Sequence, residues 1–192
     1  MFDKILQHEV LYEIRCSECF ENGIGIEYDT KLLDDYNEID TEKVLILCID
    51  EYYNTRKMQN PPPSIDCLVI VKCDNGGYGF HLVELRNVKS PSGVKRREIV
   101  KKFNTTVEKF MQDEFGSIFM DETFIVNDFK LYLITDACRI KKMFPSLTED
   151  EYRAKMKDSS LSVYQSLPPF LFRGQVAMLT PCAPDYVIKG CL

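Results

Sequence analysis

The sequence has no long apolar run, only two histidines and no familiar nucleotide-binding motif. No hydrophobic stretch approaches the about 20 residues that span a bilayer, so we expect no membrane association. The N-terminal stretch has acids and a histidine inside its apolar part and no small-residue cleavage site, which argues against a secretory signal. The glycines of NGGYG (75–79) lie between two expected strands rather than before a helix, and no serine or cysteine hydrolase signature is present. We therefore expect a soluble, cytoplasmic protein.

Eight cysteines are scattered along the chain. Without a secretion signal, we expect them to be reduced and buried rather than paired as disulfides. The CSEC stretch gives Cys16 and Cys19 the spacing of a zinc knuckle, but a structural zinc site needs a second pair of ligands. Cys182 and Cys191 match that second pair poorly. A zinc-stapled regulatory module stays open as a minor hypothesis.

The charge is unevenly distributed, although composition is that of an ordinary globular protein. The 192 residues carry a net charge of −6, which argues against indiscriminate coating of nucleic acid. Residues 1–60 hold 6 basic and 14 acidic residues, whereas residues 86–102 hold 7 basic residues and Glu98 as the single acid. One basic stretch in an acidic protein indicates a local binding surface.

The pattern of breakers and apolar residues predicts a mixed α/β core within a single domain, 1–192. The expected elements are a helix over 40–58 ended by NPPP, a strand over 64–73, a glycine turn over 74–79, a second strand over 80–88, an amphipathic helix over 94–115 and a strand at about 129–136. Residues 4–20 fit either a helix or a strand. Thr148 and Glu151 form a capping box that starts a short helix, and the proline-broken tail predicts irregular strands.

The second strand of this hairpin, FHLVELRNVKS (80–90), holds Glu84 and Arg86 in its interior. Buried charges are expensive unless something compensates them, and residues two apart share one face of a strand. Asp66, near the start of the first strand, approaches Glu84 if the register of the hairpin allows it. Two converging carboxylates form a site that suits Mg²⁺ or Mn²⁺. A cation there would activate a water and stabilise charge on a phosphate. For His81, the sequence leaves two roles open: assisting that water, or the more usual role of a packed or hydrogen-bonded strand histidine.

This layout resembles the PD-(D/E)XK superfamily of restriction-endonuclease-like nucleases, over about residues 40–136, with 137–192 as a C-terminal extension. Asp66 matches the metal-binding aspartate and Glu84 the second metal ligand, while Arg86 occupies the position of the motif lysine. Arginine keeps the positive charge but cannot act as a general base. Lys89 points to the other face of a regular strand and would need a bend at Asn87 to substitute. The resemblance also implies a preceding helical acid, for which Glu51 is favoured over Glu42.

The resemblance implies a metal-dependent endonuclease acting on DNA rather than RNA, and restriction or defence is the role that fits a small chain of this kind. A homodimer or a larger complex is compatible with it. A non-catalytic nucleic-acid-binding or protein-binding subunit with the same fold is the alternative. We expect the helix after the hairpin to present most of its lysines and arginines to solvent. The residues predicted to contact the nucleic-acid backbone are Lys89, Lys95, Arg96, Arg97, Lys101 and Lys102.

Overall fold

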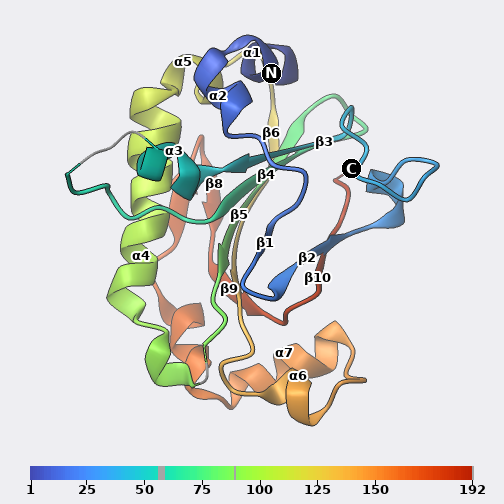
Figure 1. Cartoon of the computed structure of the whole chain (residues 1–192), viewed down its shortest axis with the longest axis vertical. Helices are drawn as coiled ribbons and strands as arrows, with labels where there is room; N and C mark the ends of the chain where they lie inside the picture. Colours follow the sequence, from blue (N-terminus) through green and yellow to red (C-terminus); the bar gives the residue numbers. More distant parts are fainter. Residues whose placement is uncertain (56–58, 89, 192) are drawn as a thin grey trace.

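A five-stranded mixed sheet forms the centre of the protein, and it is covered on both faces (Figure 1). The computed structural model describes residues 1–55, 59–88 and 90–191. The strands lie in the order β3-β4-β5-β6-β9. β4 runs antiparallel to its two neighbours β3 and β5, whereas β6 and β9 run parallel to β5. The five strands are β3 (Val44–Cys48), β4 (Cys67–Lys72), β5 (Tyr78–Leu85), β6 (Val126–Ile134) and β9 (Leu179–Cys182).

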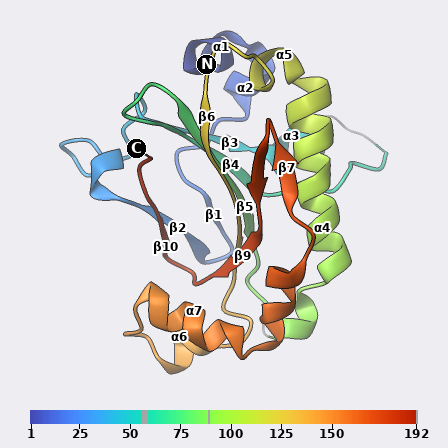
Figure 2. The ribbon, with the colours of Figure 1, turned by 180° about the vertical axis from the view of Figure 1, so that it is seen from behind.

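A long helical segment makes the crossover from β5 to β6 and covers one face of the sheet (Figures 1 and 2). It follows the short turn η2 (Pro91–Gly93) and consists of α4 (Arg96–Asn104), the π-helical η3 (Thr105–Glu114) and α5 (Gly116–Phe119). Ile99 and Phe103 of α4 are buried against Leu68, Leu82 and their neighbours in one apolar cluster. This burial provides the main driving force that holds the crossover to the sheet.

Segments from the first and last parts of the chain pack on the two faces of the central sheet. The hairpin β1 (Phe20–Glu21) and β2 (Ile24–Tyr28) lies on the face opposite α4, together with the parallel strand β10 (Tyr186–Ile188) (Figure 1). The hairpin β7 (Phe170–Phe172) and β8 (Gln175–Ala177) packs on the α4 side. The remaining short elements are α1 (Phe2–Gln7), α2 (Glu9–Glu13), η1 (Thr30–Leu32), α3 (Ile49–Thr55), α6 (Ile140–Met143), α7 (Glu149–Lys157) and η4 (Ser160–Ser166).

The sequence predicted most of these elements, with one clear error. The hairpin, the amphipathic helix, the following strand and the Thr148–Glu151 capping box are confirmed. The helix expected over 40–58 is wrong over its first half, because 44–48 form β3 and only 49–55 are helical. Residues 44–48 are consecutively apolar and contact both clusters, a pattern typical of a strand covered on both faces. Residues 56–58 lie outside the described part.

Two further expectations are settled by the fold. Residues 4–20, which fit either helix or strand, are helical over 4–7 and 9–13, and Phe20 at the end of this range begins β1. The tail does form strands, and β9 joins the central sheet beside β6, so the segment 137–192 contributes to the same core. Within the described residues, no helix has the length and apolarity needed to cross a membrane.

Candidate functional site: a carboxylate pair bridged by lysine

Asp66 and Glu84 lie opposite each other at one end of the β4–β5 hairpin. The register pairs Cys67 with Val83 and Leu68 with Leu82, so one further step sets Asp66 opposite Glu84 on the face that α4 covers. The main-chain N–H of Leu85 donates a hydrogen bond of 2.6 Å to Asp66 Oδ2. The convergence predicted from the sequence is therefore confirmed in its geometry.

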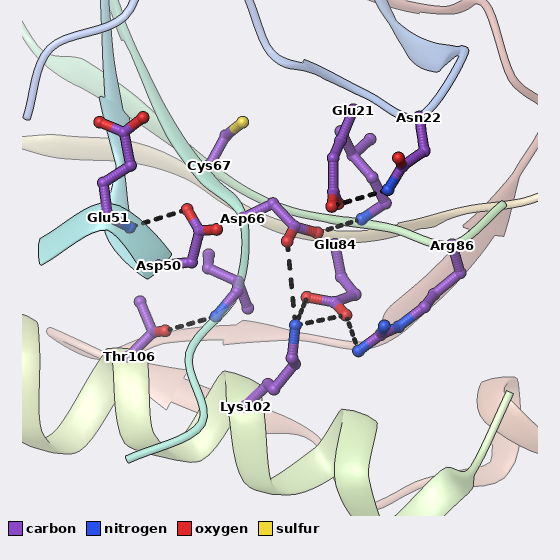
Figure 3. A network of polar contacts seen from close by, with 12 residues as sticks. Glu21, Asn22, Asp50, Glu51, Asp66, Cys67, Glu84, Arg86, Lys102 and Thr106 are labelled. Carbon is purple, nitrogen blue, oxygen red and sulfur yellow. Dashed lines mark hydrogen bonds and ion pairs between the residues drawn. The ribbon is translucent and has the colours of Figure 1, made fainter. Parts of the chain in front are cut away.

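Lys102 of α4 reaches between these two carboxylates (Figure 3). Its Nζ lies 2.8 Å from Glu84 Oε1 and 3.8 Å from Asp66 Oδ1, and it donates a hydrogen bond of 3.0 Å to Glu84 Oε2. The expectation that Lys102 faces solvent and contacts nucleic acid is wrong, since its side chain is only 16% exposed. Lys102 lies three residues after the buried Ile99, so helical periodicity alone places it beside the face that packs on the sheet.

Arg86, which directly follows β5, forms a second ion pair with Glu84. Arg86 Nη2 lies 2.7 Å from Glu84 Oε1, and the Arg86 side chain remains 31% exposed. The main chain at Arg86 is anchored to β6, because its N–H donates to the carbonyl of Ile134 and its carbonyl accepts from Thr135 Oγ1. Arg86 therefore steadies the buried carboxylate while its outer part stays accessible.

Asp50, rather than Glu51, is the acid of α3 that faces the pair. Figure 3 shows the Asp50 side chain on the Asp66 side, whereas Glu51 points away from the site. The Glu51 side chain is exposed, and its main-chain N–H donates to Asp50 Oδ1. The orientation of Glu51 therefore gives no support to its prediction as a metal ligand. Glu42, the other candidate, is exposed before β3 and does not belong to a helix.

The site holds three acids and two cations, so its negative charge is not fully compensated. The acids are Asp50, Asp66 and Glu84, and the cations are Lys102 and Arg86. Burial raises the pKa of Glu84 to about 8; repulsion from Asp66 adds to the shift, while Lys102 and Arg86 oppose it. Burial raises the pKa of Asp50 to about 6, and Asp66 again adds to the shift. An additional cation close to the three acids would stabilise their ionised forms.

The site brings carboxylate oxygens together, with a lysine ammonium between them. The carboxylates supply oxygen ligands of the kind that Mg²⁺ prefers, and the Lys102 ammonium marks the position between them where positive charge is stabilised. With the side chains arranged as they are, no group of three or more His, Cys, Asp or Glu residues in the described part of the chain is placed to hold a metal. Lys102 would therefore have to shift to admit a cation between Asp66 and Glu84.

The exposed face of α4 carries the remaining basic residues predicted to contact nucleic acid. Lys95, Arg96, Arg97 and Lys101 are exposed, as the helical spacing predicted. Lys95 forms an ion pair of 3.1 Å with Glu98. Lys89 lies outside the described residues. The site and this basic surface are therefore neighbours, joined by the helix that also supplies Lys102.

His81 takes no part in this site. It lies on the opposite face of β5, where its ring stacks on Tyr132 at a centroid distance of 5.9 Å. Its Nδ1 lies 3.5 Å from Tyr132 Oη. Complete burial lowers the pKa of His81 to about 3, so the imidazole is neutral at physiological pH. His81 is therefore a packed strand histidine, the more usual of its two roles, and it does not lie beside the carboxylates.

Six of the eight cysteines form disulfides, contrary to the expectation of reduced thiols. The pairs are Cys16–Cys48, Cys19–Cys67 and Cys73–Cys191. Cys138 and Cys182 are free. The sequence does not show which cysteines pair, because cysteines that are far apart in the chain meet only in the folded protein. Disulfides persist in oxidising surroundings, so a cytoplasmic location stays a prediction.

A separate cavity of about 930 Å³ lies beside β6, β9, β10 and α7. Tyr132, Arg153 and Tyr186 are among its lining residues, and the carboxylate pair is not.

Comparison with known proteins gives no family for this chain. No protein-family model matches it, and searches of the curated proteins and of the solved structures find no match.

Proposed function

We propose that the protein is a metal-dependent nuclease with a restriction-endonuclease-like core, which hydrolyses phosphodiester bonds in DNA. The observation that carries this proposal is the meeting of Asp66, Glu84 and Lys102 at the end of a β-hairpin. The order hairpin, crossover helix and parallel strand is the arrangement that the resemblance to the PD-(D/E)XK superfamily implies.

Lys102 supplies the amino group that the motif lacks at position 86. The motif lysine is replaced by Arg86 in sequence, but the ammonium of Lys102 reaches the same carboxylate from α4. Lysine, unlike arginine, can exchange a proton. Lys102 is therefore the better candidate to orient the attacking water, and Arg86 holds Glu84 in place.

Asp66 and Glu84 would hold the cation, with Asp50 next to them. A bound Mg²⁺ or Mn²⁺ would supply Lewis acidity and lower the pKa of a coordinated water. The Leu85 N–H fixes one oxygen of Asp66 and leaves the other toward Lys102. Arg96, Arg97 and Lys101 would contact the DNA backbone beside the site.

A non-catalytic subunit with this fold is the second candidate function. The observation that favours it is the saturation of Glu84 by two cations, Arg86 and Lys102, within the chain itself. Two cations of the chain itself already face Glu84, and the basic face of α4 would still bind nucleic acid or an acidic protein surface.

Cleavage of linear and supercoiled DNA in the presence of Mg²⁺ or Mn²⁺ tests the first function. We expect Asp66→Asn and Glu84→Gln to reduce cleavage at least a hundredfold while circular dichroism shows an intact fold. Glu51→Gln is the matched control, because this exposed acid lies next to Asp50 and points away from the site. Cleavage that survives Glu84→Gln at the parental rate would contradict the proposal, and binding without any cleavage would support the second candidate.

A further inference from the structure

Four cysteines from three separate parts of the chain converge beside the carboxylate site. Cys48 ends β3 and Cys67 begins β4, and the two are register partners in this antiparallel pair. Residues directly opposite each other share one face of the sheet, with Cβ atoms about 4.5–5.5 Å apart. Cys16 and Cys19 belong to a Cys-x-x-Cys stretch and are bonded to Cys48 and Cys67 respectively.

Backbone contacts hold the Cys-x-x-Cys segment in place beside the strands. The N–H of Cys16 donates to the carbonyl of Ile46 at 3.1 Å, and the N–H of Cys48 donates to the carbonyl of Ile14 at 2.8 Å. The Cys19 carbonyl accepts from the N–H of Ile26 in β2. The two disulfides span Cα–Cα distances of 6.1 and 6.0 Å. The four side chains therefore form a single cluster that the surrounding backbone preorganises.

The cluster has the ligand pattern of a tetrahedral metal site. One pair comes from a Cys-x-x-Cys stretch followed by a tight hairpin, in which Asn22 and Gly23 have positive φ. The other pair comes from two adjacent strands. With Zn–S bonds of about 2.3 Å, thiolates in a tetrahedron lie about 3.8 Å apart, which suits a cross-strand pair. Cys19 and Cys67 are almost completely buried, whereas Cys16 and Cys48 are half-buried, so an ion has a path from solvent.

We propose that Cys16, Cys19, Cys48 and Cys67 bind one zinc ion as a tetrathiolate site when the chain is reduced. In the disulfide form the four sulfurs carry no thiolate charge and do not act as such ligands. Thiol reductants deliver four electrons and four protons, which break both S–S bonds and form four thiols. Zinc binding then releases the four thiol protons and leaves the four sulfurs as thiolates on the ion.

The site is independent of the proposed nuclease activity, although it lies next to it. Cys67 directly follows Asp66, and Figure 3 shows the Cys67 sulfur on the side of the strand away from Lys102. Cys48 lies two residues before Asp50. A zinc ion here would clamp the N-terminal segment to the ends of β3 and β4 that carry these acids, with no role in the chemistry.

The full chain, purified without oxygen and with a phosphine reductant, tests the proposal. Elemental analysis should find one zinc per chain. Exchange of zinc for Co²⁺ should give the visible and near-ultraviolet absorption of a tetrahedral cobalt tetrathiolate. The double variants Cys16→Ser/Cys19→Ser and Cys48→Ser/Cys67→Ser should each lose at least nine-tenths of the zinc.

Cys73→Ser/Cys191→Ser is the matched control, because these two cysteines form the third disulfide at a separate place and should not affect zinc content. If the other double variants fail to fold, the cobalt spectrum of the reduced parental chain decides the matter. A reduced chain that binds neither zinc nor cobalt at one equivalent would overturn the proposal. Iron in place of zinc, or zinc retained in the variants, would overturn it as well.

Discussion

The Lys102 ammonium lies 2.8 Å from Glu84 Oε1 and 3.0 Å from Glu84 Oε2, which joins the crossover helix to a carboxylate with no exposed surface. The two residues are 18 positions apart, and the start of α4 lies between them. Their contact therefore cannot be predicted from their spacing in the sequence. Their contact links the stability of the packed core to the chemistry proposed for the site.

Replacement of Lys102 by Met should destabilise the protein by about 2 kcal/mol. The change leaves the buried Glu84 with Arg86 as its remaining partner and removes the contacts of Lys102 with both carboxyl oxygens, and a buried polar group that loses a hydrogen-bond partner costs about 1 to 3 kcal/mol. Urea unfolding measures the effect. Lys101→Met, one residue earlier on the exposed side of α4, should leave the unfolding free energy nearly unchanged. Equal stability of the two variants would show that the ion pair does not contribute to the fold.

Asp50→Asn should weaken the binding of Mn²⁺ by about tenfold, because groups just outside a metal's direct ligands orient those ligands and tune the metal. Titration calorimetry of the full chain measures the affinity. Glu51→Gln should bind Mn²⁺ as tightly as the parent, since this side chain points away from Asp66. If the two variants bind equally, Asp50 does not belong to the metal site.

Acid should destabilise the protein through His81. Its folded-state pKa of about 3 lies below the unfolded value of about 6.5, so the unfolded chain takes up a proton first as the pH falls. The contribution of His81 to the free energy of unfolding is therefore full above about pH 6.5. As the pH falls from about 6.5 to 3, this contribution decreases by about 1.4 kcal/mol per pH unit. Urea unfolding from pH 7 to pH 4 should show a shallower decline for His81→Phe than for the parent.

His8→Gln is the control for this pH profile, because it removes the other histidine and keeps His81. Its profile should follow that of the parental chain. A His81→Phe profile as steep as the parental one would assign the acid sensitivity to carboxylates instead.

The exposed face of α4 should account for much of the electrostatic binding of DNA. Arg96→Ala, Arg97→Ala and Lys101→Ala together should weaken binding to every sequence tested and lower the salt slope by about 2 to 3. Fluorescence anisotropy at several salt concentrations measures both quantities. Lys155→Ala/Lys157→Ala on α7 is the control and should leave the slope unchanged. An unchanged slope in the triple variant would place the DNA elsewhere.

Local patterns predicted much of the core. The proline triplet, the glycine turn and the β-branched residues of the first strand indicate the hairpin, and the Thr148–Glu151 box determines the start of α7. These features depend on neighbours within a few residues. The failure at 44–48 has the same origin: an uninterrupted apolar run has no period, and only the two apolar layers that cover it distinguish a strand from a buried helix.

The sequence also indicated Asp66 and Glu84, because strand alternation and a hairpin turn are enough to bring two such acids together. It did not indicate Asp50 over Glu51, since the choice depends on how a seven-residue helix turns after β3. The sequence misplaced Lys102, because a lysine at the edge of the buried face of a helix can point either to solvent or to the sheet. The position of an oppositely charged partner decides between the two. Here the partner is Glu84, whose buried carboxylate attracts the ammonium.

By itself, the sequence determined the hairpin, the amphipathic crossover helix and the carboxylates that the hairpin carries, because short-range periodicity and turn chemistry specify them. Only the tertiary structure decided that Lys102 bridges Asp66 and Glu84, and that Cys16 and Cys19 meet Cys48 and Cys67. These contacts join residues that are distant along the chain. Their distances are set by the packing of whole layers, which no local pattern encodes.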